Sequence, residues 1–252
     1  MKKNILILGT LAILSTSCKS DKKDEKTQEA DKTVDSTAMA NNEDNWTHLF
    51  NGENLESWKA FNADSISDQW QVKDGAIAFT PAEGKRESTE NLISKNSYAN
   101  FELSLEWKIS EAGNSGIMWG VQESEEFSEP YLTGPEIQIL DNKLHPDAKN
   151  GPIRQAGALY DMMPPSEDKS RNAGEWNKTV IKINHKTNKG SVRLNGTLIT
   201  EFPVHGEEWD KLVANSKFKD WEHFGKTKEG HIALQDHGDK VWFRNIKIRE
   251  LD

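Results

Sequence analysis

The sequence of 252 residues contains a single cysteine, Cys18, so the chain cannot form an internal disulfide. The apolar run at residues 5–14 is too short to span a bilayer as a mature helix. The net charge is −9, and no basic stripe with interleaved aromatic residues is present, which argues against a nucleic-acid partner.

Sequence motifs for several kinds of chemistry are also missing. There is no Gly-x-Gly-x-x-Gly and no Walker motif, so we expect no cofactor, and no nicotinamide chemistry carried out by the chain itself. There is no Gly-x-Ser-x-Gly nucleophile elbow. No His-x-x-x-His pair, Cys/His cluster or Asp-rich calcium loop appears, so no metal site is predicted, although acids from separate loops could share a structural cation.

The first 17 residues are typical of a signal peptide, with two lysines, an apolar run and two small residues before Cys18. The five residues 14–18 resemble a bacterial lipoprotein lipobox, although the large aliphatic residue, Leu14, stands one place earlier than usual. The resemblance implies that Cys18 is lipidated and that the protein is anchored in the cell envelope, at the periplasmic face or the cell surface of the outer membrane. The alternative is plain secretion with a free thiol.

Residues 18–45 are polar and contain no aromatic side chain, which predicts a disordered tether. Residues 46–252 have the length of one domain, ample for a hydrophobic core. This region contains all nine tryptophans, a number that also suits carbohydrate binding, because an indole ring stacks on the apolar face of a sugar.

Short alternating segments separated by turn residues predict an all-β sandwich rather than a doubly wound α/β fold. Phe101–Ile109 alternates over nine residues and gives the clearest strand. Residues 70–73 and 76–79 predict a hairpin, and residues 207–224 are the only candidate helix, interrupted in its middle. Further strands are expected at residues 92–95, 116–121, 136–140, 158–161, 179–184, 191–194, 197–202, 232–235 and 241–249.

The strand at 136–140 has two chemically different faces. Ile137 and Ile139 point to one side, and Glu136 and Gln138 point to the other, because successive strand side chains alternate. The aliphatic face is expected to pack into the core, which leaves a carboxylate and an amide on the floor of a groove where a sugar could lie. The alternative is a half-solvated strand whose polar side chains have no role.

A second polar stretch, residues 235–238, follows the expected strand at 232–235. Gln235 is a candidate for substrate binding, and Asp236 and His237 are candidates for catalysis, since an Asp can orient and charge an imidazole. The alternative is a capped turn. Arg244, on the last strand, either stabilises an anion in the site or lies on a solvated face.

Three further side chains are candidates for substrate contact. Trp119 and Tyr160 are expected either to stack on a sugar ring or to pack within the core or at its rim. His145, in the loop after the strand at 136–140, is expected either to reach over the groove or simply to be exposed.

The chain resembles the family once called domain of unknown function 1080 and now named for 3-keto-disaccharide hydrolase. The resemblance covers nearly all of residues 46–252. It rests on ordered motifs at Leu49–Trp58, Asn114–Ile117, Gly134–Asp141, Gly157–Asp161, Glu175–Asn177, Gly230–Gly238 and Val241–Leu251. It implies a concanavalin A-like jelly-roll sandwich of two antiparallel sheets, and activity on glycosides whose sugar carries a 3-ketone.

The residues favour an unusual chemistry for such a substrate. Ordinary glycosidases need two carboxyl groups about 5–9.5 Å apart, and related jelly-roll enzymes place them in a Glu-x-Asp-x-Glu strand. Here only Glu136 of that pattern is an acid. A 3-ketone acidifies the proton on C2, so one base would suffice for elimination of the glycosidic oxygen, followed by addition of water.

Two classes of function therefore stay open. The first is an enzyme that cleaves 3-keto-disaccharides or 3-keto-glucosides, served by an oxidoreductase upstream that makes the ketone. The second is a non-catalytic carbohydrate-binding jelly roll. Convergence of Glu136, Asp236 and His237 in one pocket would favour the enzyme, because a lectin needs no base.

Overall fold

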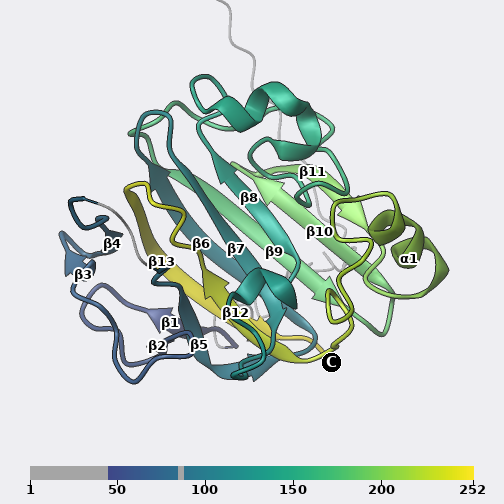
Figure 1. Ribbon diagram of the computed structural model, residues 1–252, viewed down its shortest axis with the longest axis horizontal. Coiled ribbons are helices and arrows are strands. Elements are labelled where there is room, and N and C mark those ends of the chain that lie inside the picture. The colour runs from purple at the N-terminus through teal and green to yellow at the C-terminus, as the bar shows by residue number, and fades with distance from the viewer. Residues whose placement is uncertain (1–44, 85–87) are drawn as a thin grey trace, which may run out of the picture. The chain divides into compact units, whose positions relative to one another are not determined.

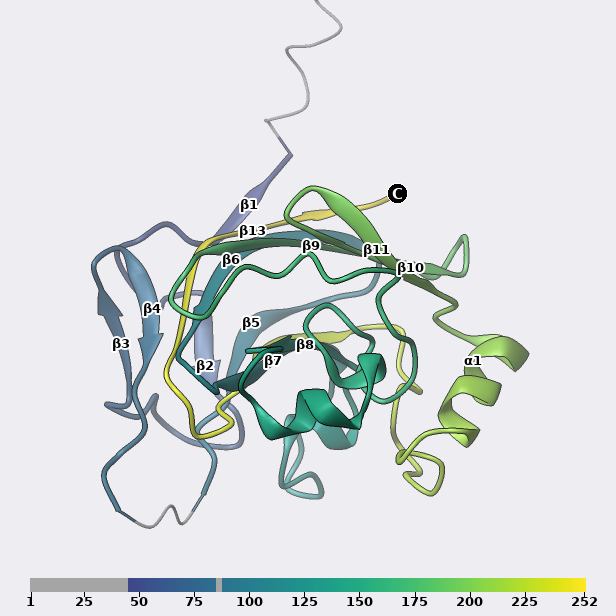
Figure 2. The same cartoon turned by 90° about the horizontal axis from the view of Figure 1, so that it is seen from above.

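The computed structural model of the protein describes residues 45–84 and 88–252 (Figure 1). The expected signal peptide, Cys18 and all but the last residue of the expected tether lie outside the described residues. The described chain forms two antiparallel β-sheets that lie one above the other, as Figure 2 shows. These sheets confirm the predicted concanavalin A-like jelly-roll sandwich.

The larger sheet has eight strands in the order β11-β10-β9-β6-β13-β4-β3, with β1 also paired to β13. Its strands are β1 (Thr47–Phe50), β3 (Trp70–Lys73), β4 (Ala76–Phe79), β6 (Phe101–Ile109), β9 (Asn177–Asn184), β10 (Lys189–Leu194), β11 (Thr197–Phe202) and β13 (Val241–Glu250). The smaller sheet has five strands in the order β2-β5-β12-β7-β8. They are β2 (Trp58–Ala60), β5 (Leu92–Tyr98), β7 (Asn114–Val121), β8 (Glu136–Leu140) and β12 (Gly230–Leu234). Within residues 45–84 and 88–252 the helices are α1 (Gly206–Ala214) and three short 3₁₀ turns, η2 (Pro130–Leu132), η3 (Pro146–Asn150) and η4 (Pro152–Arg154).

The core lies between the two sheets, and β6 shows how the sequence builds it. Its five odd-numbered residues are buried and apolar, whereas Glu102, Glu106 and Lys108 lie on the opposite face. The period of two that predicted this strand is therefore the pattern that buries one face. Within this core the indole N–H of Trp107 is satisfied, because Nε1 donates to Thr179 Oγ1 at 2.8 Å.

The strand β8 departs from expectation in one respect. Ile137 and Ile139 pack into the core as predicted, but the polar face is buried as well. Residues 157–160 run along this edge strand, and the backbone N–H of Tyr160 donates to the carbonyl of Glu136 at 3.0 Å. Only an isolated bridge forms there, between Ile137 and Leu159, instead of the strand expected at 158–161. Asp161 turns the chain away with a positive φ of 59°.

The helix α1 is also shorter than the expected segment at 207–224, because it ends at Ala214. The following residues form turns in which Phe218 and Phe224 stack at 3.9 Å between ring centroids. The aromatic residues whose spacing suggested a longer helix thus pack against one another in turns instead. Within residues 45–84 and 88–252, no helix is both long enough and apolar enough to cross a membrane.

Candidate functional site

A pocket of about 330 Å³ opens on the outer face of the five-stranded sheet, the face that points away from the eight-stranded sheet. Its floor comes from β7, β8 and the turn after β12, and its walls come from Tyr160 and the turns after α1. This volume lies at the lower end of the range for small-molecule sites. The lining residues are Asn114, Tyr131, Gly134, Glu136, Gln138, Tyr160, Lys217, Phe218, Trp221, Phe224, Gln235 and His237.

Glu136 is the only acid among the described residues that line the pocket. It is 8% exposed, and this burial raises the pKa of Glu136 to about 7, against the attraction of Lys217 and a hydrogen bond from Gln235, which both lower it. Its side chain lies against Gly116 on β7, where a Cβ atom would come within 2.1 Å of Glu136 Oε1. Glycine at position 116 therefore makes room for the carboxyl group.

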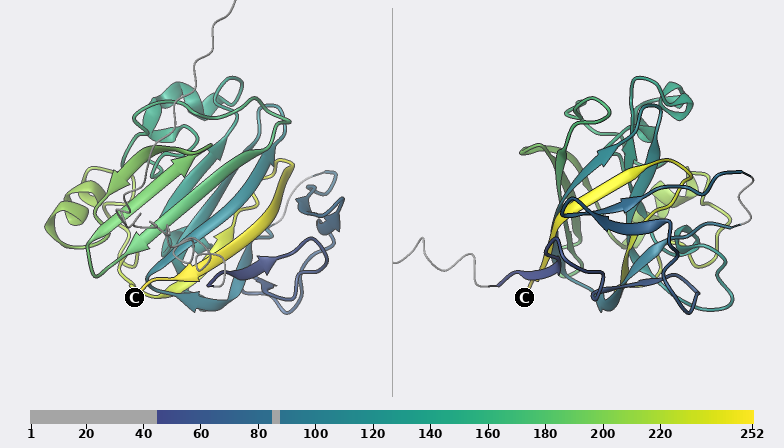
Figure 3. Two further views of the ribbon diagram at one scale, coloured as in Figure 1. Left: turned by 180° about the vertical axis from the view of Figure 1, so that it is seen from behind. Right: turned by 90° about the vertical axis from the view of Figure 1, so that its left-hand side faces the viewer.

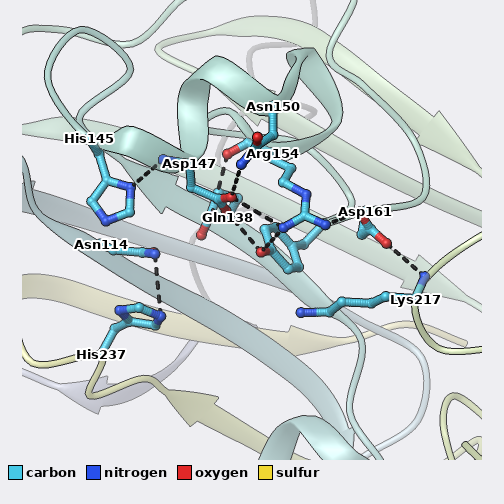
Figure 4. A network of polar contacts seen from close by, with 10 residues as sticks. Asn114, Gln138, His145, Asp147, Asn150, Arg154, Asp161, Lys217 and His237 are labelled. Atoms are coloured by element: carbon cyan, nitrogen blue, oxygen red, sulfur yellow. Dashed lines mark hydrogen bonds and ion pairs between the residues drawn. The ribbon is translucent and has the colours of Figure 1, made fainter.

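Lys217 brings a positive charge to the same pocket from the turn after α1. Burial lowers the pKa of Lys217, and the neighbouring carboxylate of Glu136 opposes that shift. The ammonium Nζ lies 4.3 Å from the centre of the Tyr160 ring. In Figure 4 the side chain extends from its loop toward the middle of the site. A buried acid and a partly desolvated amine thus line the same small pocket.

A network of hydrogen bonds behind the pocket fixes Tyr160 and the Lys217 loop (Figure 4). The Tyr160 hydroxyl donates to Asp147 Oδ2 at 2.9 Å, and Arg154 donates to that hydroxyl, also at 2.9 Å. Arg154 pairs with Asp161 at 2.7 Å, and Asp161 accepts from the backbone N–H of Lys217 at 2.7 Å. Burial and the bond to Asp147 raise the pKa of Tyr160, so its hydroxyl stays protonated.

On the other side of the site, His237 lies beside Asn114, with 3.4 Å between Nε2 and the amide Nδ2. The rings of His145 and His237 lie 6.4 Å apart in an edge arrangement. His145 Nδ1 accepts from the backbone N–H of Asp147 at 3.1 Å, so the proton of a neutral His145 is on Nε2. Figure 4 shows Asn114, His145 and His237 across the site from Lys217.

Two buried acceptor atoms on lining residues have no hydrogen-bond partner in the described protein, namely Asn114 Oδ1 and Gln235 Oε1. Buried acceptors in native proteins are nearly always paired, so unpaired ones at a pocket are suited to a ligand that brings donors. Gln138, the other amide predicted for the site, is 2% exposed and packs its Oε1 against the backbone N–H of Ile139 at 3.1 Å.

The structure gives Asp236 a place outside the pocket lining. Its carboxylate accepts from the backbone N–H groups of Glu90 and Gly238, each at 2.8 Å. Its chain neighbours Gln235 and His237 line the pocket instead. Its observed contacts are those of a turn-forming residue, which was the alternative interpretation of this stretch.

Two other candidates also lie away from the pocket. Arg244 is on the outer face of the eight-stranded sheet, where it donates to Glu106 at 2.8 Å and covers the Trp176 ring at 4.0 Å. Trp119 is 5% exposed and stacks on Phe202 in the core, 5.6 Å between ring centroids. Tyr160, by contrast, lines the pocket. His145 does not line it but lies beside the lining residue His237.

Sequence reasoning missed Lys217 and most of the aromatic wall. Lys217 stands between ordinary polar and aromatic residues, in a segment interpreted as broken helix, so no local pattern pointed to it. Asn114 and Gly116 were noticed only as part of a motif, and the packing of Glu136 against Gly116 explains why a glycine stands there.

The fold and the pocket define a carbohydrate-active type of jelly roll: a two-sheet sandwich with a polar, partly aromatic cavity on the outer face of one sheet. The family model of the 3-keto-alpha-glucoside-1,2-lyase-like domain matches residues 45–249, and the chain belongs to this family. Membership in it makes the protein glycoside-hydrolase-like.

Three relatives illustrate the similarity. A 3-keto-disaccharide hydrolase of Bacteroides thetaiotaomicron is 35% identical over 244 residues, covering 87% of this chain and 83% of the relative. A Parabacteroides distasonis crystal structure classed as a glycosyl hydrolase is 31% identical with a TM-score of 0.76, covering 82% of this chain and 94% of that one. A second structure of that class from the same organism is 29% identical with a TM-score of 0.60, covering 82% and 99%.

Proposed function

We propose that the protein cleaves the glycosidic bond of 3-keto-disaccharides or 3-keto-glucosides by removing the proton on C2. The observation that carries the proposal is Glu136, a lone buried acid in the pocket whose pKa burial raises to about 7. A carboxyl group poised near neutral pH suits proton transfer to and from carbon. The family and the Bacteroides relative support the substrate class.

In the proposed reaction Glu136 takes the proton from C2, and the electron pair of that bond forms an enolate with the C3 ketone. The enolate then expels the glycosidic oxygen from C1, and this oxygen leaves with a proton as an alcohol. Water adds to the resulting double bond, with hydroxyl on C1 and hydrogen on C2. The net change is hydrolysis, and no oxidant or reductant is consumed.

The pocket contains suitable partners for Glu136. The Lys217 ammonium would stabilise the negative enolate oxygen, which is worth most in a buried site of low dielectric. His237 would donate the proton to the leaving oxygen, and the unpaired acceptors of Asn114 and Gln235 would receive sugar hydroxyls. A two-carboxylate mechanism lacks its second acid among the described lining residues.

The experiment compares a 3-keto-glucoside with the same glucoside before oxidation, with product analysis. We expect cleavage of the keto substrate only, because the C2 proton of an ordinary glucoside is not acidic. Comparable cleavage of both would reject the proposal and favour a two-carboxylate glycosidase. Binding of either compound without cleavage would instead favour a non-catalytic carbohydrate-binding module. A 3-keto substrate must come from an oxidoreductase, so such an enzyme is the expected upstream partner.

We further propose that Cys18 anchors the protein in the cell envelope through lipid, on the basis of the signal sequence before it. Cys18→Ala should then move the protein from the membrane fraction to the soluble fraction when the membranes are washed with concentrated salt, which screens any remaining electrostatic contact. The anchor would be contradicted if mass spectrometry finds no lipid on the wild-type protein and the variant divides between membrane and soluble fractions as the wild type does.

A further inference from the structure

The outer face of the eight-stranded sheet differs from the rest of this acidic protein. Directly opposite residues on neighbouring antiparallel strands share a face, and this register places Arg244, Glu106 and Lys178 in one row. A second row joins Arg249, Glu102 and Lys182. Figure 3 (left) shows this sheet face-on, with the strands β9, β6 and β13 side by side and no described helix over them.

Basic side chains dominate this face, although the whole chain carries a net charge of −9. The strands β6, β9 and β13 present four cations besides the two arginines that pair with Glu102 and Glu106. These four are Lys108, Lys178, Lys182 and Lys247. The neighbouring strands β10 and β11 add Lys189, Arg193 and Glu201, a net charge of +1.

Tryptophans accompany the cations. Five of the nine tryptophans are buried and Trp221 lines the pocket, while the other three are half-buried on this face. Lys108 lies 4.6 Å from the Trp242 ring centre and 5.1 Å from that of Trp176. Lys247 lies 4.9 Å from that of Trp46. Because a cation covers each indole, these rings are poorly placed to stack on sugars.

We propose that this face, formed by β6, β9 and β13, docks the domain onto a membrane surface of anionic phospholipids. Lysine, arginine and tryptophan are the side chains that settle at the membrane interface, where basic groups meet phosphate and indoles sit at headgroup level. A hollow of about 370 Å³ beside Lys178 and Lys247 offers space for a headgroup. Trp46, the second described residue, also lies on this face against Lys247, so the described chain starts beside it.

Docking in this orientation would leave the pocket free. The pocket lies on the outer face of the five-stranded sheet, on the far side of the sandwich from the basic face. A soluble glycoside could therefore enter while the domain rests on the membrane. The proposal concerns a separate surface and does not depend on the reaction proposed for the pocket.

The test uses the full chain carrying Cys18→Ala, so that lipidation cannot contribute. Co-sedimentation is measured with vesicles of phosphatidylglycerol mixed with phosphatidylcholine, and with vesicles of phosphatidylcholine alone. We expect binding to the mixed vesicles only, weakening as salt is added. Quenching of tryptophan fluorescence by brominated phosphatidylglycerol should accompany it. Equal binding to both vesicles, or binding to neither, would overturn the proposal.

A triple variant localises the effect. Lys178→Gln, Lys182→Gln and Lys247→Gln together should weaken vesicle binding at least about tenfold, because each basic residue near an anionic surface contributes independently. The matched control, Lys95→Gln, Lys211→Gln and Lys226→Gln, removes the same charge elsewhere and should bind as the parent does. Equal loss in both triples would overturn the assignment of the face. Binding to soluble polygalacturonate without binding to vesicles would reassign it to acidic polysaccharide.

Discussion

Glu136 and Asp236 are both buried carboxylates at the five-stranded sheet, 8% and 2% exposed, yet their surroundings differ. Asp236 accepts two backbone N–H groups, a contact that fixes the turn between β12 and β13. No backbone N–H of the described residues donates to the Glu136 carboxyl, which instead meets Gln235 and the charge of Lys217. The comparison teaches that the donors around a buried acid, rather than its burial, separate a structural carboxylate from one free to exchange a proton.

The largest effect that would test this comparison is on catalysis. Glu136→Gln keeps the shape of the side chain but removes the base, so the rate on a 3-keto-glucoside should fall about 10²–10⁴-fold. Substrate binding should persist, which isothermal titration can measure. A variant with near-normal kcat would remove Glu136 from the role of base.

Lys217→Met should have the next largest effect, because the variant keeps the apolar stem and loses the ammonium. Loss of one group that stabilises an enolate oxygen typically costs about 10²–10³-fold in rate. Lys217 also lowers the pKa of Glu136. The rising limb of the pH–rate profile, expected near pH 7 in the wild type, should therefore move to higher pH.

The matched control is Lys219→Met, which changes an exposed lysine two residues away. It should leave both rate and profile unchanged. A Lys217→Met profile with an unshifted midpoint would show that the two groups do not interact.

The substitution Glu136→Gln, which should lower activity, should raise the stability of the protein above neutral pH. Burial raises the pKa of Glu136 from 4.5 to about 7, so the folded state holds a proton there that the unfolded state releases. Stability contributed by this proton is present below about pH 4.5 and is lost as pH rises through about 7. Glu136→Gln should therefore be more stable than the wild type at pH 8, by roughly 3 kcal/mol at most, with no gain at pH 4. Denaturant titrations at both pH values would measure it, and an equal difference at both would contradict the cause.

Asp236→Asn should lower the stability of the protein and leave its activity nearly unchanged. The variant turns an amide N–H₂ toward a backbone N–H, which typically costs about 1–3 kcal/mol of unfolding free energy. Activity of the folded protein should stay within a few-fold of wild type, because Asp236 does not line the pocket. A selective loss of kcat at unchanged stability would place Asp236 back among the catalytic residues.

The sequence predicted the fold well because alternation and turn residues are local signals. Phe101–Ile109 was predicted to the residue, and Ile137 and Ile139 enter the core as expected. The segment at 207–224 was predicted less well, since its aromatic spacing suits a helix, although tertiary stacking of Phe218 on Phe224 favours turns.

The site was predictable only where one strand defines it. Glu136 and Gln138 share a face of β8 by alternation, and His237 continues the face of Gln235. Lys217 could not be predicted, because it reaches the pocket through a turn held by Asp161, a contact between segments 56 residues apart. For Arg244 the sequence left a role in the site and a solvated face both open, because a strand pattern does not say to which sheet the strand belongs; the structure places it on the outer face of the eight-stranded sheet.

The central claim is that Glu136 removes a proton from C2, and solvent exchange tests it most directly. A 3-keto-glucoside is turned over in deuterium oxide, and the keto-sugar product is analysed promptly for deuterium at C2 by NMR and mass spectrometry. A nonenzymatic control with authentic product corrects for spontaneous exchange. Elimination followed by hydration predicts one deuterium at C2 with wild-type protein, and loss of this incorporation together with cleavage in Glu136→Gln. Full cleavage with protium retained at C2 would contradict the account.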